Sequence, residues 1–345
     1  MSERPPLLSL DEALSSLLAV AGARVIADVD EVPTFDGLGR VLAAEVRSTI
    51  DVPGADNTSM DGYALRAADV TLPGTVLPVS QRIAAGSVGE VLAHGSAARI
   101  FTGAPIPAGA DCVVMQEQCA AIPGDGLGAV RVDAVPAAGR WVRRRGEDVR
   151  RDAVVLPRGT RLGPQSLGLA ASVGVARLPV VRRPRVALFS TGDELVMPGE
   201  VLKPGAIYNS NRFLLRGLLQ ACGCDFDDLG IVPDQLQATR DALRRAALGH
   251  DLILSSGGVS VGEEDHLRPA VQAEGRLDLW QIAMKPGKPL AFGEVASPQG
   301  RSALFVGLPG NPVSSFVTFL VTVAPLLKAL QGMPARAPLS KFRIA

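Results

Sequence analysis

The half of the chain after Pro184 alternates regularly between short apolar runs and amphipathic stretches, and this alternation limits the possible folds more than any other feature. The apolar runs predict strands at Arg185–Phe189, Asp228–Val232, Asp251–Leu254, Leu279–Met284, Leu290–Glu294 and Ala303–Val306. The intervening stretches predict helices at Asn211–Cys222, Gln235–Leu248, Asp265–Ala273 and Pro312–Leu330. Alternation of this kind predicts a doubly wound α/β domain with a mostly parallel sheet.

The half before residue 181 has a different character. Short runs of Val, Ile and Ala are separated by Gly and Pro, as at Ile83–Val91, Ala97–Phe101 and Ala129–Val132, and such runs are typical of small β domains. A chain of 345 residues is long enough for two or three domains of roughly 100–200 residues each. The sequence therefore predicts a multi-domain protein with β-rich parts and an α/β domain.

Charge, cysteine content and hydropathy exclude several classes of protein. The 35 basic and 35 acidic residues give a formal net charge of zero, which argues against a nucleic-acid binder that neutralises phosphates. Cys222 and Cys224 could hold a metal or form a redox pair, but structural thiols are the better interpretation of their spacing. Asp11 and Glu12 interrupt any export signal, and the apolar stretch Phe316–Leu327 is too short to span a bilayer. We therefore expect a cytoplasmic protein that binds neither membrane nor nucleic acid.

Four polar, glycine-containing loops follow predicted strands of the α/β domain. They are residues 190–194, 255–265, 285–289 and 308–312. In doubly wound sheets, ligands bind at the carboxyl ends of the strands, where the strand order reverses. If the strands are parallel, all four loops gather on one rim of the sheet and form a site there.

The loop after the third strand has the composition of a phosphate site. Gly257 and Gly258 remove Cβ atoms, so the backbone can approach a ligand closely and offer N–H groups to an anion. Ser255, Ser256 and Ser260 add hydroxyl donors. A plain Gly-Gly turn is the alternative interpretation.

Acidic and basic residues stand at the same strand ends. The acids are Asp193, Glu194, Asp234 and Asp265, which suit Mg²⁺ because that ion takes one or two carboxylates together with substrate phosphates. Helix capping is the alternative role for these acids. Lys285 and Lys288 flank a Pro-Gly turn, where two ammonium groups could hold an anion or remain solvated.

The loop before the last helix has a strong helix-start signature. Asn311 is a good N-cap, and Pro312 is a good first helical residue. Exposed N–H groups together with Ser314 and Ser315 could form a second anion pocket, although a capped helix alone explains these residues.

Seven ordered segments together resemble the molybdopterin molybdotransferase family, whose animal relative is the C-terminal region of gephyrin. The segments are Asp56–Ala64, Phe101–Asp111, Arg143–Val149, Phe189–Leu195, Ser255–Asp265, Lys285–Pro289 and Gly307–Ser314. Their order and their spread over most of the chain make this resemblance far more specific than any single segment.

The resemblance implies a chain of four parts. An elongated linker domain would comprise residues 1–50 and 143–180, with a β-rich domain inserted at 51–142. An α/β domain of the molybdopterin-binding type would occupy 181–332, and residues 333–345 would begin a C-terminal β domain that is essentially missing from this chain.

The resemblance also implies the last step of molybdenum cofactor synthesis, in which adenylylated molybdopterin and molybdate give the metallated cofactor, with release of AMP and a requirement for Mg²⁺. By this resemblance, Glu194 and Asp265 would bind Mg²⁺, and Lys285 and Lys288 would hold molybdate or phosphates. The catalytic positions it implies are Asp61, Thr102, Glu194, Asp234, Asp265 and Lys285. The substrate-binding positions are Ser190, Thr191, Gly192, Ser256, Gly257, Gly258, Val259, Ser260, Lys288, Pro309, Asn311 and Ser314.

Partners and alternatives follow from the same resemblance. It implies a homodimer, because the inserted β domain of the family faces the α/β domain of the other subunit, and a molybdopterin adenylyltransferase as upstream partner. Gln281 stands where relatives often carry Lys and would supply a hydrogen bond but no charge. An adenylyltransferase and a non-catalytic scaffold remain alternative functions; the long N-terminal half argues against the first, and the acids and lysines of the rim argue against the second.

Overall fold

The computed structural model describes residues 8–259 and 266–334 of the 345-residue chain. It contains two compact units. The α/β unit comprises the described parts of residues 1–44, 157–164 and 177–345, and the β unit comprises residues 45–156 and 165–176. A multi-domain chain with α/β and β-rich parts is thereby confirmed. The division into four domains stays a prediction.

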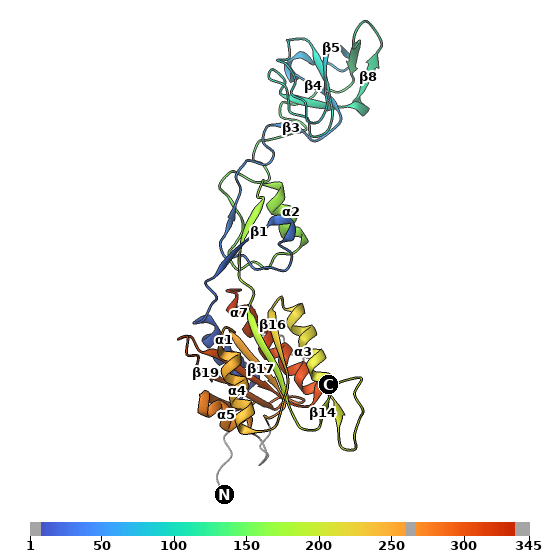
Figure 1. Cartoon of the computed structure of the whole chain (residues 1–345). Coiled ribbons are helices and arrows are strands. Elements are labelled where there is room, and N and C mark those ends of the chain that lie inside the picture. The colour runs from blue at the N-terminus through green and yellow to red at the C-terminus, as the bar shows by residue number, and fades with distance from the viewer. Residues whose placement is uncertain (1–7, 260–265, 335–345) are drawn as a thin grey trace. The chain divides into compact units, whose positions relative to one another are not determined.

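A six-stranded sheet forms the centre of the α/β unit (Figure 1). Its strands, in spatial order, are β16 (Asp225–Val232), β13 (Arg185–Thr191), β17 (Leu252–Ser256), β20 (Ala303–Leu308), β19 (Pro289–Val295) and β18 (Gly275–Gln281). The first four are mutually parallel, whereas β19 runs antiparallel to both of its neighbours. The predicted mostly parallel sheet is therefore confirmed.

The strand order reverses at β13. The chain passes from β13 to β16 on one side and then crosses to β17 on the other side. Because β18 runs parallel to β20, the carboxyl ends of β13, β16, β17, β18 and β20 all lie at one edge of the sheet. The described parts of the four polar loops expected on one rim do gather there.

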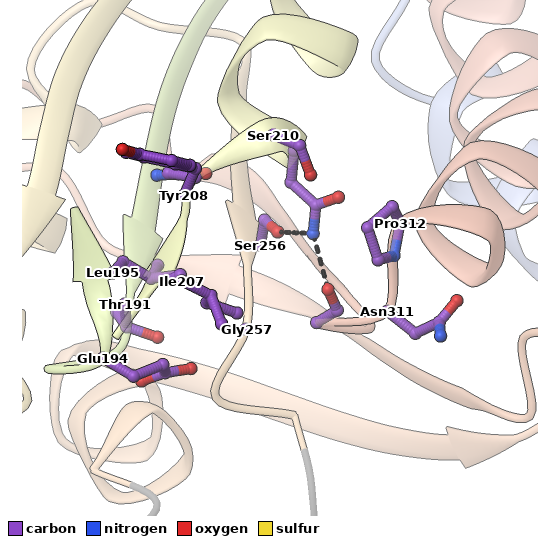
Figure 2. A pocket seen from close by; sticks show the side chains of 13 residues that line it. Thr191, Glu194, Leu195, Ile207, Tyr208, Ser210, Ser256, Gly257, Asn311 and Pro312 are labelled. Atoms are coloured by element: carbon purple, nitrogen blue, oxygen red, sulfur yellow. Dashed lines mark hydrogen bonds between the residues drawn. The ribbon is translucent and has the colours of Figure 1, made fainter. Parts of the chain in front are cut away.

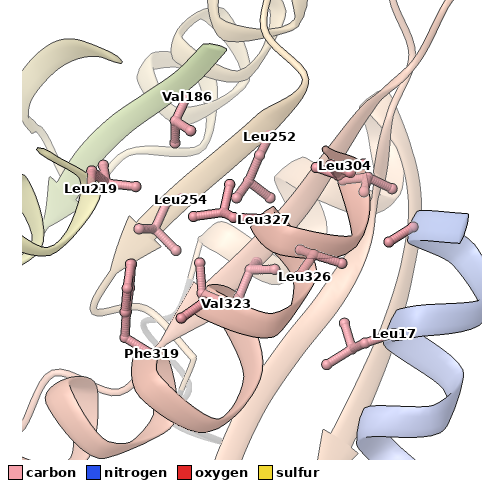
Figure 3. Close-up of a cluster of buried hydrophobic side chains, with 14 of the residues drawn as sticks. Leu17, Val186, Leu219, Leu252, Leu254, Leu304, Phe319, Val323, Leu326 and Leu327 are labelled. Atoms are coloured by element: carbon pink, nitrogen blue, oxygen red, sulfur yellow. The ribbon is translucent and has the colours of Figure 1, made fainter. Parts of the chain in front are cut away.

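Alternating side chains give the sheet two apolar faces, each covered by helices. On β13, Val186 and Leu188 face the cluster that contains α1 (Leu10–Gly22), while Ala187 and Phe189 face the opposite cluster. The remaining helices of this unit are α3 (Ser210–Ala221), α4 (Leu236–Ala247), α5 (Leu267–Glu274), α6 (Pro312–Thr318) and α7 (Ala324–Leu330). Figure 3 shows the larger cluster, in which Leu17 of α1 and Leu326 of α7 approach the sheet. Packing of this kind holds the strand ends in fixed positions.

The last helical segment departs from one regular helix. Residues Phe319–Val323 form a π-helical turn between α6 and α7. Pro325, at the start of α7, has no N–H to donate, and a wider turn accommodates this loss. The 19-residue segment Pro312–Leu330 is long and apolar enough to cross a membrane, so the sequence argument from length was wrong, but 56% of its most apolar window is buried inside the protein. It is a core helix of the α/β unit.

The β unit is built on a second six-stranded sheet. In spatial order its strands are β7 (Cys112–Met115), β4 (Gly62–Leu65), β6 (Ala97–Ile100), β5 (Thr75–Ile83), β9 (Ala129–Val132) and β8 (Cys119–Ile122). Short pairs join β2 (Val46–Arg47) to β11 (Val154–Leu156) and β3 (Asn57–Thr58) to β10 (Val142–Arg143). In the α/β unit, β1 (Val29–Pro33) pairs with β12 (Arg177–Val181) and β14 (Leu195–Val196) with β15 (Ile207–Tyr208). The remaining elements are α2 (Pro164–Ser172) and 3₁₀ turns at Thr34–Asp36, Ala67–Asp69 and Gln116–Gln118.

The four cysteines are free thiols. Cys112 and Cys224 are buried, and burial raises the pKa of both thiols, that of Cys112 to about 12. Protonated, buried thiols of this kind are poor nucleophiles and poor metal ligands. The interpretation of Cys222 and Cys224 as structural residues agrees with this environment.

Candidate functional site

A cavity of about 310 Å³ opens at the carboxyl edge of the α/β sheet, where the strand order reverses (Figure 2). Its walls come from the ends of β13 and β17, the β14–β15 pair, the start of α3 and the loop before α6. Of the residues predicted from the sequence, Thr191, Glu194, Ser256, Gly257 and Asn311 line this cavity. Chain segments that are far apart in the sequence therefore meet at the predicted edge.

The turn after β13 brings a carboxylate to the cavity. Gly192 has a φ of +143°, and a Cβ built there would lie 2.6 Å from Oε2 of Glu194. A side chain at Gly192 would thus displace the Glu194 carboxylate, which folds back over the turn. Glu194 is exposed, and its carboxylate makes no hydrogen bond or ion pair within residues 8–259 and 266–334, although its backbone carbonyl accepts from the N–H of Ile207 at 2.8 Å. Its charge is therefore available to a ligand.

The Gly257–Gly258 turn lies against the end of β13. A Cβ at Gly257 would lie 2.6 Å from the carbonyl oxygen of Thr191, and one at Gly258 would lie 2.9 Å from Oγ1 of Thr191. Both glycines also have φ in the left-handed region. The N–H of Gly257, however, donates to the carbonyl oxygen of Leu308 at 3.1 Å. The expectation that this N–H serves an anion was wrong, because it joins β17 to β20.

The loop before α6 satisfies most of its own polar groups. Oδ1 of Asn311 accepts from the N–H of Ser314 at 3.0 Å, and the carbonyl oxygen of Asn311 accepts from the N–H of Ser315. The hydroxyl of Ser315 donates to the carbonyl oxygen of Pro309, which is itself buried. The expected second anion pocket therefore loses most of its donors. Asn311 keeps its amide nitrogen for a ligand, because Oδ1 is the cap acceptor (Figure 2).

The acids of the rim come from two strand ends. The N–H of Asp234, after β16, donates to Oδ1 of Asp193, after β13, at 3.2 Å. Glu194 lines the cavity, whereas Asp234 does not. No group of three or more His, Cys, Asp or Glu side chains could hold a metal among the residues that the structure describes. An all-protein metal cage is thus absent from that part of the chain.

The two lysines lie on a loop fixed against α6. The N–H of Ile282 donates to the carbonyl oxygen of Lys288 at 2.9 Å and closes the loop. Gly287 is buried with a φ of +107°, and a Cβ there would lie 2.5 Å from Oγ1 of Thr318. Lys285 and Lys288 are exposed and form no ion pair with any described residue. They stand at the same edge of the sheet as the cavity but are not among its lining residues.

Some of the other predicted positions in this unit are described but do not line the cavity, and the rest lie outside the described residues. Ser190 and Val259 are buried, and Val259 belongs to an apolar cluster of the core. Ser314 is half-buried and does not line the cavity. Ser260 and Asp265 lie outside the described residues, as does the side chain of Gln281 at the end of β18.

The two predicted positions of the β unit do contact each other. Oδ1 of Asp61 accepts from both the N–H and the hydroxyl of Thr102, each at 2.7 Å. These two hydrogen bonds, the backbone one first, lower the pKa of Asp61 and favour its charged form. Thr102 follows β6 and Asp61 precedes β4, so the β4–β6 pairing brings them together.

Sequence reasoning missed the segment from the end of β15 to the start of α3. Tyr208, Asn209 and Asn211 all line the cavity. Oδ1 of Asn209 accepts from the N–H of Arg212 and caps α3, while Nδ2 of Asn211 donates to Oγ of Ser256. Two asparagines at a predicted helix start indicate an N-cap, because Asn is a preferred N-cap residue, and this signal could have drawn attention to the start of α3.

This chain is similar to known proteins along most of its length. Residues 8–174 match the model of the MoeA N-terminal region (domain I and II), and residues 187–329 match a probable molybdopterin binding domain. A molybdopterin molybdenumtransferase from Haemophilus influenzae is 40% identical over 326 residues, which cover 94% of this chain and 78% of that protein. Gephyrin from Dictyostelium discoideum is 30% identical over 94% of this chain and 49% of its own length.

A solved structure is similar to this chain along most of its length. The crystal structure of the molybdopterin biosynthesis moeA protein from Pyrococcus horikoshii has a TM-score of 0.80 at 30% identity, and the match covers 95% of this chain and 80% of that chain. With both domain models matched in order and these relatives similar along nearly its full length, this chain belongs to the molybdopterin molybdenumtransferase family.

Proposed function

We propose that this protein inserts molybdenum from molybdate into adenylylated molybdopterin and releases AMP. The observation that carries the proposal is the cavity at the switch point of the α/β sheet, lined by Thr191, Glu194, Ser256 and Asn311. Its volume of about 310 Å³ is at the small end of the range for small-molecule sites, and part of a nucleotide-bearing substrate would extend along the open rim.

The polar groups of the cavity suit the phosphates of that substrate. The hydroxyls of Thr191 and Ser256 and the amide nitrogen of Asn311 are donors, and Gly257 adds no side chain that would keep a ligand away. These groups would bind and orient the anhydride that links AMP to molybdopterin. Their role is to hold the ground state in place, since none of them is a strong acid or base.

Mg²⁺ fits the donors that are present. Glu194 offers a hard, uncommitted carboxylate on the cavity wall, and Mg²⁺ commonly binds through one or two carboxylates plus substrate phosphates instead of a closed protein cage. Glu194 would hold the ion beside the phosphates. When bound, Mg²⁺ would act as a Lewis acid that withdraws charge from a phosphoryl oxygen.

Lys285 and Lys288 are the proposed anion ligands for molybdate. Their loop is fixed by the close fit of Gly287 against α6, so the two ammonium groups are presented from a stiff support. Neither lysine is engaged by an acid among the described residues. Molybdate is a dianion, and two unpaired ammonium groups at the same sheet edge would attract it.

A second copy of the chain is the proposed partner. Val313, Phe316 and Leu320 are exposed along α6 and the π-helical turn, and Phe213 is exposed on the neighbouring α3. An apolar surface of this kind is typical of homodimer interfaces. Sedimentation of the wild type as a dimer, and of Phe316→Asp as a monomer, would support this; Val201→Asp, at an exposed apolar residue in the loop between β14 and β15, is the matched control.

The decisive experiment mixes the whole protein with adenylylated molybdopterin, molybdate and Mg²⁺. We expect AMP to appear in step with the metallated cofactor, and omission of molybdate or of Mg²⁺ to suppress product. Attachment of AMP to free molybdopterin would instead identify an adenylyltransferase. If the folded protein neither releases AMP from the substrate nor attaches AMP to molybdopterin, a non-catalytic scaffold would be its function.

A further inference from the structure

Asn211 is a buried amide in the wall of the cavity, and it joins two of the segments that form that wall. It is the second residue of α3 and only 7% exposed. Its Nδ2 donates to Oγ of Ser256, at the end of β17, and to the carbonyl oxygen of Gly310, in the loop before α6, each at 2.8 Å (Figure 2). These partners lie 45 and 99 residues further along the chain.

The chemistry of these partners fixes the direction of both hydrogen bonds. A backbone carbonyl can only accept, so the atom of Asn211 that faces Gly310 is the amide nitrogen. An amide nitrogen has no lone pair to offer, and Ser256 must therefore be the acceptor in its bond with Asn211. The orientation of the Asn211 amide is thus determined by the backbone.

The hydroxyl hydrogen of Ser256 must then point elsewhere. Ser256 is 3% exposed and lines the cavity, and within the described part of the chain no acceptor receives its hydroxyl hydrogen. A buried hydroxyl donor without an acceptor is costly unless a ligand satisfies it. The cavity is the direction in which an oxygen atom of a ligand can do so.

We propose that Asn211 is a positioning residue, which keeps the Ser256 hydroxyl turned as a donor toward a phosphate oxygen of the ligand and holds the peptide of Gly310 at the opposite wall. This inference rests on the proposed function, since it assigns the ligand of Ser256 as the phosphates of the adenylylated substrate. In this role Asn211 acts on the ligand through Ser256.

A positioning role differs measurably from a merely structural one. If Asn211 acts through Ser256, removal of the amide should weaken phosphate binding only while Ser256 is present. If Asn211 only stabilises the fold, its removal should affect binding independently of Ser256. A double-mutant cycle separates the two cases, because residues that act as one unit give non-additive changes.

The test measures binding of AMP by calorimetry for the full chain and its Asn211→Ala, Ser256→Ala and double variants. We expect each single variant to bind AMP about tenfold more weakly than the wild type. The double variant should also bind AMP about tenfold more weakly, whereas independent effects would weaken binding about a hundredfold. KM for adenylylated molybdopterin should rise by the same factor with a smaller change in kcat. Gln220→Ala, at an exposed amide on the same helix, is the control and should bind as the wild type does.

Asn211→Asp keeps the shape of the side chain and covers the case in which Asn211→Ala does not fold. An aspartate would accept the Ser256 hydroxyl hydrogen and turn it away from the cavity, so we expect AMP binding at least as weak as in Ser256→Ala. Multiplicative losses in the cycle, or wild-type affinity in Asn211→Asp, would overturn the inference while leaving the proposed function intact. A wild-type protein that neither binds AMP nor releases it from the substrate would overturn both.

Discussion

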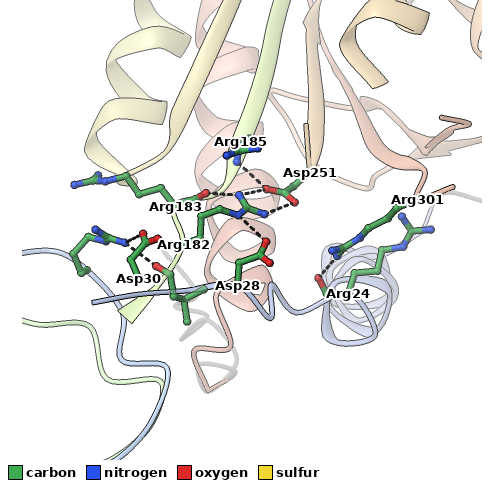
Figure 4. A network of polar contacts seen from close by, with 10 residues as sticks. Arg24, Asp28, Asp30, Arg182, Arg183, Arg185, Asp251 and Arg301 are labelled. Atoms are coloured by element: carbon green, nitrogen blue, oxygen red, sulfur yellow. Dashed lines mark hydrogen bonds and ion pairs between the residues drawn. The ribbon is translucent and has the colours of Figure 1, made fainter. Parts of the chain in front are cut away.

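The two edges of the α/β sheet use charged residues in opposite ways. At the amino edge, where β13, β17 and β20 begin, the charged side chains pair with one another (Figure 4). Arg182 donates to both oxygens of Asp251, at 3.0 and 3.1 Å, and to Asp28 at 2.9 Å. At the carboxyl edge, Glu194, Lys285 and Lys288 have no ion partner among the described residues.

The pairs of the amino edge attach the N-terminal segment to the sheet. Arg24 donates to Glu294 at 2.6 Å and also to Ser302, just before β20. Asp251 additionally accepts from the N–H of Arg185, at the start of β13. Charges that are largely removed from water need partners, and here the partners are supplied by the protein itself.

The difference teaches which charges are structural and which are free to meet a ligand. The residue types are similar at both edges, and a count of acids and bases would not separate them. The charged groups of the two edges differ in whether their hydrogen-bonding atoms already have partners within the protein. We therefore expect substitutions at the amino edge to lower stability, and substitutions at the carboxyl edge to lower activity with little effect on stability.

The largest expected effect is at Asp251. Asp251→Ala should lower the free energy of unfolding by about 3 kcal/mol, because it leaves the mostly buried Arg182 without its two-point partner and the N–H of Arg185 without an acceptor. Asp28→Ala removes the exposed partner of the same arginine and should cost less than about 1 kcal/mol. Urea denaturation followed by far-UV circular dichroism measures both. Equal losses in the two variants would contradict the structural role of the buried pair.

Glu194 is the corresponding test at the carboxyl edge. Glu194→Gln should reduce AMP release about a hundredfold, equivalent to about 2.7 kcal/mol, because the amide keeps the shape but loses the charge for Mg²⁺. Its free energy of unfolding should stay within about 0.5 kcal/mol of the wild type. Glu200→Gln, at an exposed acid in the next loop, between β14 and β15, is the matched control and should keep full turnover. A clear loss of stability in Glu194→Gln would contradict the proposed difference between the two edges of the sheet.

The sequence was sufficient to place the carboxyl-edge loops together. The alternation of strands and helices after Pro184 predicted parallel strands, and parallel strands end at one edge. Glu194 and Ser256 could therefore be assigned to one site although they lie on different strands. This step needed only local patterns and a general rule of topology.

Hydrogen bonds between distant segments could not be predicted in the same way. Asn211 looked like a helix-start residue, and its partners Ser256 and Gly310 follow from the packing of α3 against the strand ends. Likewise, the N–H of Gly257 donates to the carbonyl oxygen of Leu308, and this hydrogen bond depends on the register of β17 and β20. A local sequence pattern does not predict hydrogen-bond partners that lie on distant segments.

The β unit shows where local patterns fail even for strands. Of the run Ile83–Val91, only Ile83 belongs to a strand, because Gly86 turns the chain and Gly89 lies against Ile83, where a Cβ would be 2.4 Å from its Cδ1. The strand β5 (Thr75–Ile83) was missed because Pro78 breaks the apolar pattern. Packing of turns and the tolerance of a proline in a strand are decided by tertiary context.

The lysine loop is expected to give a smaller effect than Glu194. Lys285→Ala and Lys288→Ala should each raise KM for molybdate about tenfold, equivalent to about 1.4 kcal/mol, because each removes one of two positive charges. Their free energies of unfolding should match the wild type, since neither lysine is paired in the described structure. Lys203→Ala, at an exposed lysine between β14 and β15, is the control. A loss of stability in either variant would place the lysines with the paired charges of the amino edge.

The smallest expected effect is a change in the acid dependence of stability. Glu274 ends α5 at the amino edge, and hydrogen bonds from Arg244 hold its pKa below the ordinary value of 4.5, with burial opposing and Arg240 adding to the shift. Because the folded-state pKa is the lower one, the contribution of Glu274 is fully present above about pH 4.5 and is lost as the pH falls through the folded-state value. Glu274→Gln should therefore lower stability at pH 7 but flatten its decline between about pH 4.5 and 3, and Arg244→Gln should flatten it in the same direction. Unfolding free energies measured across this pH range test the assignment, and a decline as steep as that of the wild type in both variants would show that this paired carboxylate contributes nothing to acid sensitivity.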